Sequence, residues 1–311
     1  MGSVDGVAAV AVVDAVDRRG APPAPAPDNR SARRRRPAVP LRQLVINYTG
    51  FQTEFTAPRR RLELPTGCVT LVFNFSDGLW VTRTEDLGTT RLRPAARAMI
   101  SGPRTVPAIG VHAGVVYGLE VNMTPQGCYR LFGVPMWHFE DAHVDLEEVL
   151  GTRGRYLTER LQALGSWTER FTLLDEVLCA RLAHAPAPTP EVGGALSRLW
   201  QDSRSLTRVS ASTGWSARTV RARFREQVGL SPKAVARVFR LQHALRMLAA
   251  GTAAAHVAAV CGYHDQAHLS REVKAMTGLS PSQFVRLRGG LAPGSSLDRM
   301  PGRISSVMLS G

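Results

Sequence analysis

The chain has 311 residues, a hydrophobic content of 44% and a formal net charge of +14 at pH 7. This length suits two domains, and the composition supports ordinary folded cores. The four cysteines stand far apart without a C-x-x-C pair, which argues against a disulfide framework or a cysteine zinc site, and no apolar run is long enough to span a membrane. We therefore expect a cytoplasmic protein with a polyanionic partner, chiefly nucleic acid.

Residues 1–39 are rich in Ala, Pro and Arg, which is the composition of a disordered tail. The run Arg33–Arg36 makes this tail a candidate basic arm. Neither feature predicts a folded element before residue 40.

Residues 40–184 predict an N-terminal domain in which strands precede helices. The stretch CVTLVFNFSDGLWVTR reads as strand, turn and strand, and Val115–Met123 reads as a further strand. After Pro125 the apolar period becomes helical. Helices are predicted over residues 126–133, Leu146–Leu150, Tyr156–Leu164 and Trp167–Ala183.

A second domain is predicted over residues 195–288, after a Pro- and Gly-rich linker at residues 185–194. Residues 196–288 hold 15 Lys and Arg against 4 Asp and Glu, so +11 of the net charge lies there. The Gly- and Ser-rich residues 289–311 are predicted to be a disordered tail.

The stretch GYHDQAHLSREVKAMTGLSP predicts a turn between two helices. A helix over Ala254–Cys261 ends at Gly262, where a positive φ costs glycine nothing. Asp265 is a suitable N-cap for a second helix over Gln266–Thr277. The inward residues of that helix are predicted to be Leu269, Val273 and Met276.

An upstream stretch, GWSARTVRARFREQVGLSP, repeats this pattern at an offset of 49 residues. Leu206 and Val209 anchor its first helix, Gly214 makes the turn, Ser216 caps, and the second helix covers Ala217–Val228. A long helix from Pro232 to about Ala250 joins the two copies.

Two short helices with a tight turn, the second basic on its outer face, indicate a helix-turn-helix unit that places its second helix in the major groove. The connecting helix would span roughly 28 Å at ~1.5 Å per residue, close to one DNA turn of ~34 Å. Such a spacer suits two reading helices in successive major grooves.

The outward residues of the two second helices are the candidate DNA contacts. Arg218, Arg221, Gln266 and Arg271 are predicted to read bases, because Arg pairs with guanine and Gln with adenine. Arg225 and Lys274 are predicted phosphate contacts. The supporting candidates are Ser216, Thr219, His268 and Ser270.

These stretches resemble the AraC/XylS family of transcription regulators over about 95 of the 311 residues. The family's tail pattern is met by Ala258, Gly262, Tyr263, Asp265, Gln266, His268, Leu269, Arg271, Lys274, Gly278, Ser280, Pro281 and Phe284, and its upstream pattern by Gly214, Trp215, Ser216, Arg218, Val220 and Phe224. The chain departs from the family at Val273, where Phe is usual, and at Ala222, where an outward Arg is common.

The resemblance implies an α+β protein: a small antiparallel β domain with trailing helices, then an all-α domain with two helix-turn-helix units joined by a long helix. It implies an N-terminal domain that senses a small molecule or dimerises, with double-stranded DNA, RNA polymerase, an unidentified effector and a second copy as partners. We expect no enzymatic activity, metal, cofactor or membrane partner. Two alternatives stay open, namely an enzyme or DNA-repair fusion that uses the C-terminal domain for targeting, and a non-specific DNA binder.

Overall fold

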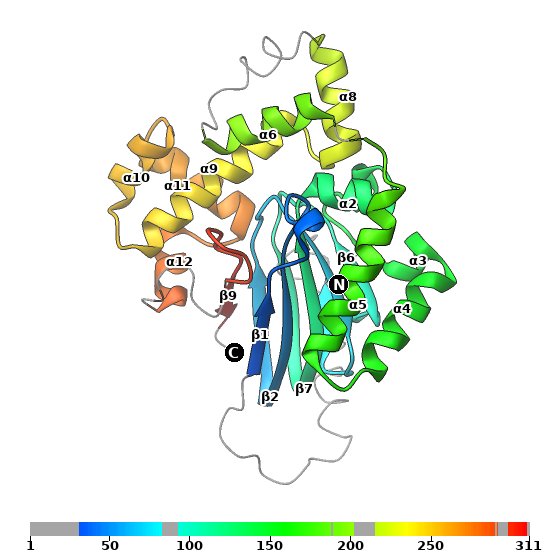
Figure 1. The fold of residues 1–311 in the computed structure, drawn as a ribbon. Coiled ribbons are helices and arrows are strands. Elements are labelled where there is room, and N and C mark those ends of the chain that lie inside the picture. The colour runs from blue at the N-terminus through cyan, green and yellow to red at the C-terminus, as the bar shows by residue number, and fades with distance from the viewer. Residues whose placement is uncertain are drawn as a thin grey trace, which may run out of the picture.

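The computed structural model describes residues 31–82, 93–187, 189–201, 215–289, 291 and 298–309 (Figure 1). Within them an antiparallel sheet carries helices on one face, and a second group of helices lies beside the sheet. The predicted α+β architecture is confirmed. No described helix is both long and apolar enough to cross a membrane. The predictions for residues 1–30, and for the helix around Leu206 and Val209, lie outside the described residues.

Two long antiparallel strands, β2 (Val45–Glu63) and β7 (Ala108–Met123), form the central ribbon of the sheet. Their register shifts between Phe55 and Arg59, opposite Gly114, whose φ is +59°. Such a bulge bends and twists the ribbon, so the two halves of each strand pair with different neighbours.

Four strands flank the ribbon, two on each side. β3 (Val69–Asn74) and β4 (Leu79–Thr82) pair with different halves of β7, and β1 (Ser31–Arg35) and β9 (Ser306–Leu309) pair with different halves of β2. The sheet is completed by β6 (Ala98–Ser101) on β3, β8 (His143–Asp145) on β6, and β5 (Arg93–Pro94) on β4. The predicted strand, turn and strand at residues 68–83 are therefore present, but both strands pair with β7.

The helices of the N-terminal domain cover one face of the sheet (Figure 1). They are α2 (Pro125–Phe132), α3 (Leu146–Leu150), α4 (Thr152–Ala163) and α5 (Trp167–Ala183), with short 3-10 turns η1 (Val39–Leu41) and η2 (Met136–Phe139). A capping box at Ser166 starts α5, and Phe171 on this helix stacks on Tyr48 of β2. The buried Asp175 accepts hydrogen bonds from the Tyr48 hydroxyl (2.9 Å) and the Arg35 guanidinium (2.9 Å).

The C-terminal helices pack around α9, the long central helix of that domain. The described helices are α6 (Pro190–Gln201), α8 (Ala217–Val228), α9 (Pro232–Ala249), α10 (Ala254–Cys261), α11 (Gln266–Thr277) and α12 (Pro281–Arg288). Serine N-caps at 216, 231 and 280 and Asp265 start four of them, and glycines with positive φ follow α8, α10, α11 and α12. Local capping chemistry therefore fixes these boundaries.

Three segments differ from the composition-based expectation. Residues 31–35 of the predicted N-terminal tail form β1, residues 306–309 of the predicted C-terminal tail form β9, and α6 begins inside the predicted linker. Both outer strands gain backbone pairing with β2, and the Arg35–Asp175 pair adds to this for β1. The composition of a segment does not indicate pairing with residues so distant in the sequence.

The C-terminal segment, residues 298–309, is fixed by a buried ion pair with α12. The Arg288 guanidinium donates to both carboxylate oxygens of Asp298 at 3.1 and 2.9 Å, and both side chains are almost fully buried. We expect Asp298→Asn to lower the free energy of unfolding by about 3–5 kcal/mol, because breaking a buried pair leaves an uncompensated charge.

Urea unfolding of the full chain measures this effect. The matched control is Glu147→Gln, which removes an exposed pair with Arg155 (3.3 Å) and is expected to cost under ~1 kcal/mol. Equal, small losses for both variants would contradict the prediction.

Candidate DNA-binding surface and interior cavity

The downstream helix-turn-helix consists of α10 and α11 joined at Gly262, whose φ is +73°. The Asp265 carboxylate caps α11 by accepting the backbone N–H of His268 at 2.6 Å. This hydrogen bond, followed by one with His264, lowers the pKa of Asp265, so the cap is ionised at neutral pH. The inward stripe, Leu269, Val273 and Met276, is buried as the sequence predicts.

The outer face of α11 exposes Gln266, Arg271 and Lys274 to solvent. Two other candidates also have contacts within the domain. His268 is half-buried with its ring edge-on to Tyr263, and the Ser270 hydroxyl donates to the Gln266 carbonyl at 2.9 Å. Gln266, Arg271 and Lys274 are therefore the more accessible part of this face.

A buried acid that the sequence analysis missed holds α11 against α9. The Glu272 carboxylate, 8% exposed, pairs with Arg237 at 2.6 Å and with Arg240 at 2.8 Å. The Arg240 guanidinium also lies over the Tyr263 ring, 4.8 Å from its centroid. These contacts hold α11 from its inner side. The sequence did offer one sign of this role, because Glu272 is an acidic residue on a basic helix in a domain with only four acidic residues.

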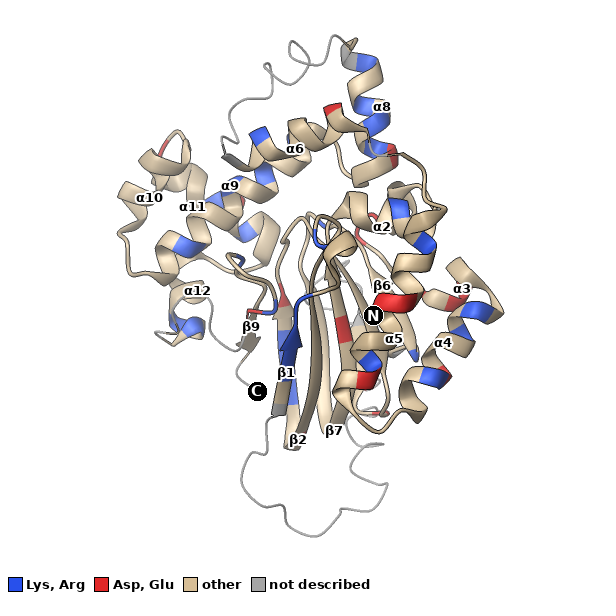
Figure 2. Cartoon of the chain, viewed as in Figure 1, with Lys and Arg blue, Asp and Glu red and all other residues tan. Residues whose placement is uncertain are grey.

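The upstream unit presents α8, which Ser216 caps through the backbone N–H of Thr219 (3.1 Å). Val220, Phe224 and Val228 are buried as predicted, whereas Arg218, Thr219 and Arg221 are exposed. Figure 2 shows basic residues, all of them Arg, repeated along α8. Its 12 residues match the 12 of α11, and the two helices lie at opposite ends of the 18-residue α9 in the chain.

The C-terminal half of α8 contacts the N-terminal domain. Arg225 pairs with Glu140 beside η2 at 3.6 Å, and Glu226 accepts the Tyr129 hydroxyl of α2 at 3.0 Å. Gly229 approaches so closely that an added Cβ would lie 2.7 Å from the Met136 carbonyl oxygen. Arg225, a predicted phosphate contact, is therefore engaged by an acidic side chain of the other domain, although it stays largely exposed.

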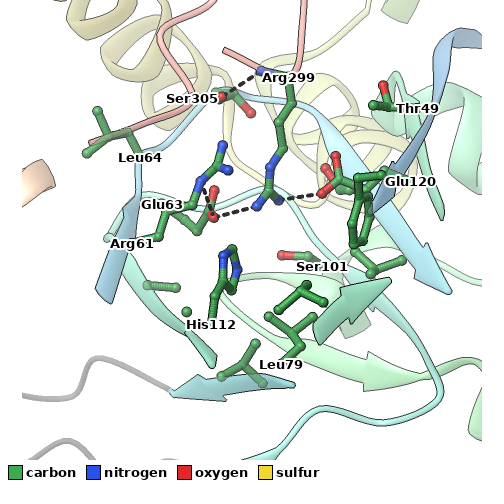
Figure 3. A pocket seen from close by; sticks show the side chains of 18 of the residues that line it. Thr49, Arg61, Glu63, Leu64, Leu79, Ser101, His112, Glu120, Arg299 and Ser305 are labelled. Atoms are coloured by element: carbon green, nitrogen blue, oxygen red, sulfur yellow. Dashed lines mark hydrogen bonds and ion pairs between the residues drawn. The ribbon is translucent and has the colours of Figure 1, made fainter. Parts of the chain in front are cut away.

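A cavity of about 270 Å³ is lined by residues of β2, β3, β4, β6 and β7 and by the C-terminal segment. Most of its wall is apolar, with side chains such as Phe51, Leu79 and Met99. Charged side chains also line the cavity. Arg34, Arg59 and Arg104 contribute to its wall, and Arg61, Glu63, Glu120 and Arg299 meet above His112 (Figure 3). The sequence gives no local sign of this grouping, because its members come from β2, β7 and the C-terminal segment.

Arg299 bridges the two carboxylates of this group. Its Nη2 lies 2.9 Å from Glu63 Oε1 and its Nη1 lies 2.9 Å from Glu120 Oε1, while Arg61 Nε lies 3.1 Å from Glu63 Oε1. Burial opposes the charge of Arg299, yet Glu120 and Glu63 together raise its pKa. Burial, followed by Arg61 and Arg299, lowers the pKa of His112 to about 3, so this imidazole is neutral at pH 7.

In the described part of the chain, no group of three or more His, Cys, Asp or Glu side chains could hold a metal ion. The described cysteines are free thiols, and Cys68 is buried at the cavity wall. The chemistry available in the cavity is therefore hydrogen bonding and ion pairing beside apolar surface.

Two family models match the chain. Residues 209–287 match a helix-turn-helix domain, and residues 33–145 match a domain of unknown function, DUF6597. No curated protein matches.

Among solved structures, ToxT from Vibrio cholerae is similar to this chain at a TM-score of 0.41 and 8% identity, covering 77% of this chain and 97% of that one. Wild-type ToxT with a bound unsaturated fatty acid gives a TM-score of 0.42 and 10% identity, covering 80% and 97%. The helix-turn-helix model and the motif from Ala258 to Phe284 show that residues 209–287 form a helix-turn-helix domain of the AraC type.

Proposed function

We propose that the protein recognises a specific DNA site with α8 and α11 in successive major grooves. The observation that carries this proposal is the pair of capped, 12-residue helices with exposed basic faces, separated by the 18-residue α9. At ~1.5 Å per residue α9 is roughly 27 Å long, which is compatible with reading heads about one DNA turn apart.

The two helices would contribute unequally to base recognition. On α11, Arg271 and Gln266 are exposed and would contact base edges, and Lys274, which is also exposed, would contact a phosphate. On α8, Arg218 and Arg221 take the base-reading role, but Ala222 stands where α11 has Arg271. Ser216, Thr219, His268 and Ser270 would support these contacts, and Arg225 would reach a phosphate after leaving Glu140.

The N-terminal domain is proposed to modulate DNA binding through a small molecule held in the cavity. The cavity supplies an apolar wall and charged side chains, which is the usual make-up of a small-molecule site. RNA polymerase and a second copy of the chain stay predicted partners. Helix α5 turns Leu173, Leu174 and Leu178 into the domain core, so its outer face offers little apolar surface to a second copy.

Sequence-specific binding is tested by selecting genomic DNA fragments with the full-length protein at ~150 mM salt and sequencing the bound pool, since affinity depends steeply on salt. We expect an enriched site with two short motifs about one helical turn apart, because the reading heads are joined by one rigid helix. A pool with no enriched motif would instead favour the non-specific binder.

The role of α11 is tested by Arg271→Ala. We expect this change to weaken binding to the selected site by roughly 5–150-fold, equivalent to ~1–3 kcal/mol, and to relax base preference at one position. The matched variant Lys274→Ala should weaken binding to all sequences alike and reduce the salt dependence. Both are measured by fluorescence anisotropy on the selected site and its single-base variants. A uniform loss for Arg271→Ala would make this residue a phosphate contact.

A further inference from the structure

The C-terminal segment crosses from the DNA-binding domain into the sheet of the N-terminal domain. It follows α12, and its strand β9 pairs antiparallel with the second half of β2, with Ser306 opposite Glu63 and Leu309 opposite Arg60. The backbone N–H of Leu64 also donates to the Ser305 carbonyl at 2.9 Å. Figure 1 shows β9 lying between the helical domain and the sheet.

The same segment is held firmly by the DNA-binding domain. Besides the Arg288–Asp298 pair, the Gln242 amide of α9 donates to the Ile304 carbonyl (3.0 Å) and accepts the Ile304 N–H (2.9 Å). Ile304 and Val307 are fully buried in the apolar core that contains α9 and α11 residues. A displacement of this segment therefore reaches the helices that carry the reading heads.

Inside the cavity, the segment contributes the guanidinium that occupies the two-carboxylate site. Arg299 extends between Glu63 and Glu120 (Figure 3), and Met300, Ser305 and Met308 add to the same wall. The Arg299 carbonyl accepts a hydrogen bond from the Asn47 amide at 3.0 Å, which fixes its backbone at the cavity.

The charges around Arg299 determine which kind of chemical group could replace it. Glu63 has a second cation in Arg61, but Glu120 is 4% exposed and its carboxylate is paired with Arg299. Withdrawal of Arg299 would leave a buried carboxylate without this partner, and an isolated buried charge is costly. Burial raises the pKa of Glu120, whereas Arg61 and Arg34, as well as Arg299, favour its charged form. A cation with N–H donors in place of Arg299 would keep this carboxylate paired, and the apolar wall favours an apolar body behind those donors.

We propose that Glu63 and Glu120 form a guanidinium-binding subsite, filled in this state by Arg299, and that a small organic amidine or guanidine competes for it and releases β9 from the sheet. This inference rests on the proposed sensing role of the cavity and specifies its ligand class and its route to the DNA-binding domain. Arg299 competes with the ligand for the subsite. The apparent affinity for the ligand is therefore reduced in proportion to the fraction of molecules in which Arg299 has left the subsite.

The first test is calorimetric titration of benzamidine into the full-length protein and two variants. Arg299→Ala should bind benzamidine at least ~10-fold more tightly than the unchanged protein, as expected when the subsite is open in under about a tenth of molecules. Adding Glu120→Gln to Arg299→Ala should abolish that gain. No gain in Arg299→Ala, or a gain that survives Glu120→Gln, would overturn the proposal.

The second test needs no variant and so does not depend on how the variants fold. Hydrogen–deuterium exchange of the unchanged protein should show loss of protection at Ser306–Leu309 when benzamidine is added, while α5 keeps its protection. Neutral benzamide and anionic benzoate are the size-matched controls. Unchanged protection of β9 with benzamidine, or equal loss with benzoate, would contradict a cation-specific subsite.

Both measurements are made without DNA. A failure here leaves the DNA-selection result standing, and failure of that selection leaves the benzamidine result interpretable.

Discussion

Buried charge must be paired, and in this protein that requirement joins the C-terminal segment to both domains. Arg288 and Asp298 neutralise each other within the DNA-binding domain, and Arg299, the next residue, neutralises Glu63 and Glu120 inside the sheet. Each of these buried charges would destabilise the fold without its partner. The C-terminal segment therefore belongs to both domains, and the position of the helical domain beside the sheet depends on it.

Helix α9 transmits this constraint to the DNA-binding surface. Gln242 on its inner side binds the C-terminal segment, while Arg237 and Arg240 clamp Glu272 of α11. The face of α11 proposed to read DNA is thus supported on its inner side by ion pairs as well as by its apolar stripe.

The two reading helices differ in how they relate to the N-terminal domain. α11 packs on its own domain, whereas α8 also contacts α2 and η2 through Glu226, Arg225 and Gly229. The acidic Glu140 pairs with Arg225, which we propose as a phosphate contact. In this structure the C-terminal half of α8 therefore contacts the N-terminal domain directly. Helix α11 is connected to that domain through α9 and the C-terminal segment.

Much of the DNA-binding domain followed from the sequence because its signals are local. Ser216 and Asp265 cap within three residues, Gly262 and Gly278 permit the positive φ that ends each helix, and the apolar spacing of α11 selects its buried face. These signals predicted the bounds of α8, α10 and α11, and the exposed positions of Arg218 and Arg271. The strand-then-helix order of residues 40–184 followed from the change of apolar period.

Tertiary structure alone decided the remainder. The partners of Arg299 lie up to 236 residues away, at Glu63, and the carboxylate that engages Arg225 belongs to another domain. A Gly- and Ser-rich segment without its own apolar period carries no local sign that it will complete a sheet. Its structure comes from unpaired strand edges and buried carboxylates elsewhere in the chain, which no window of neighbouring residues contains.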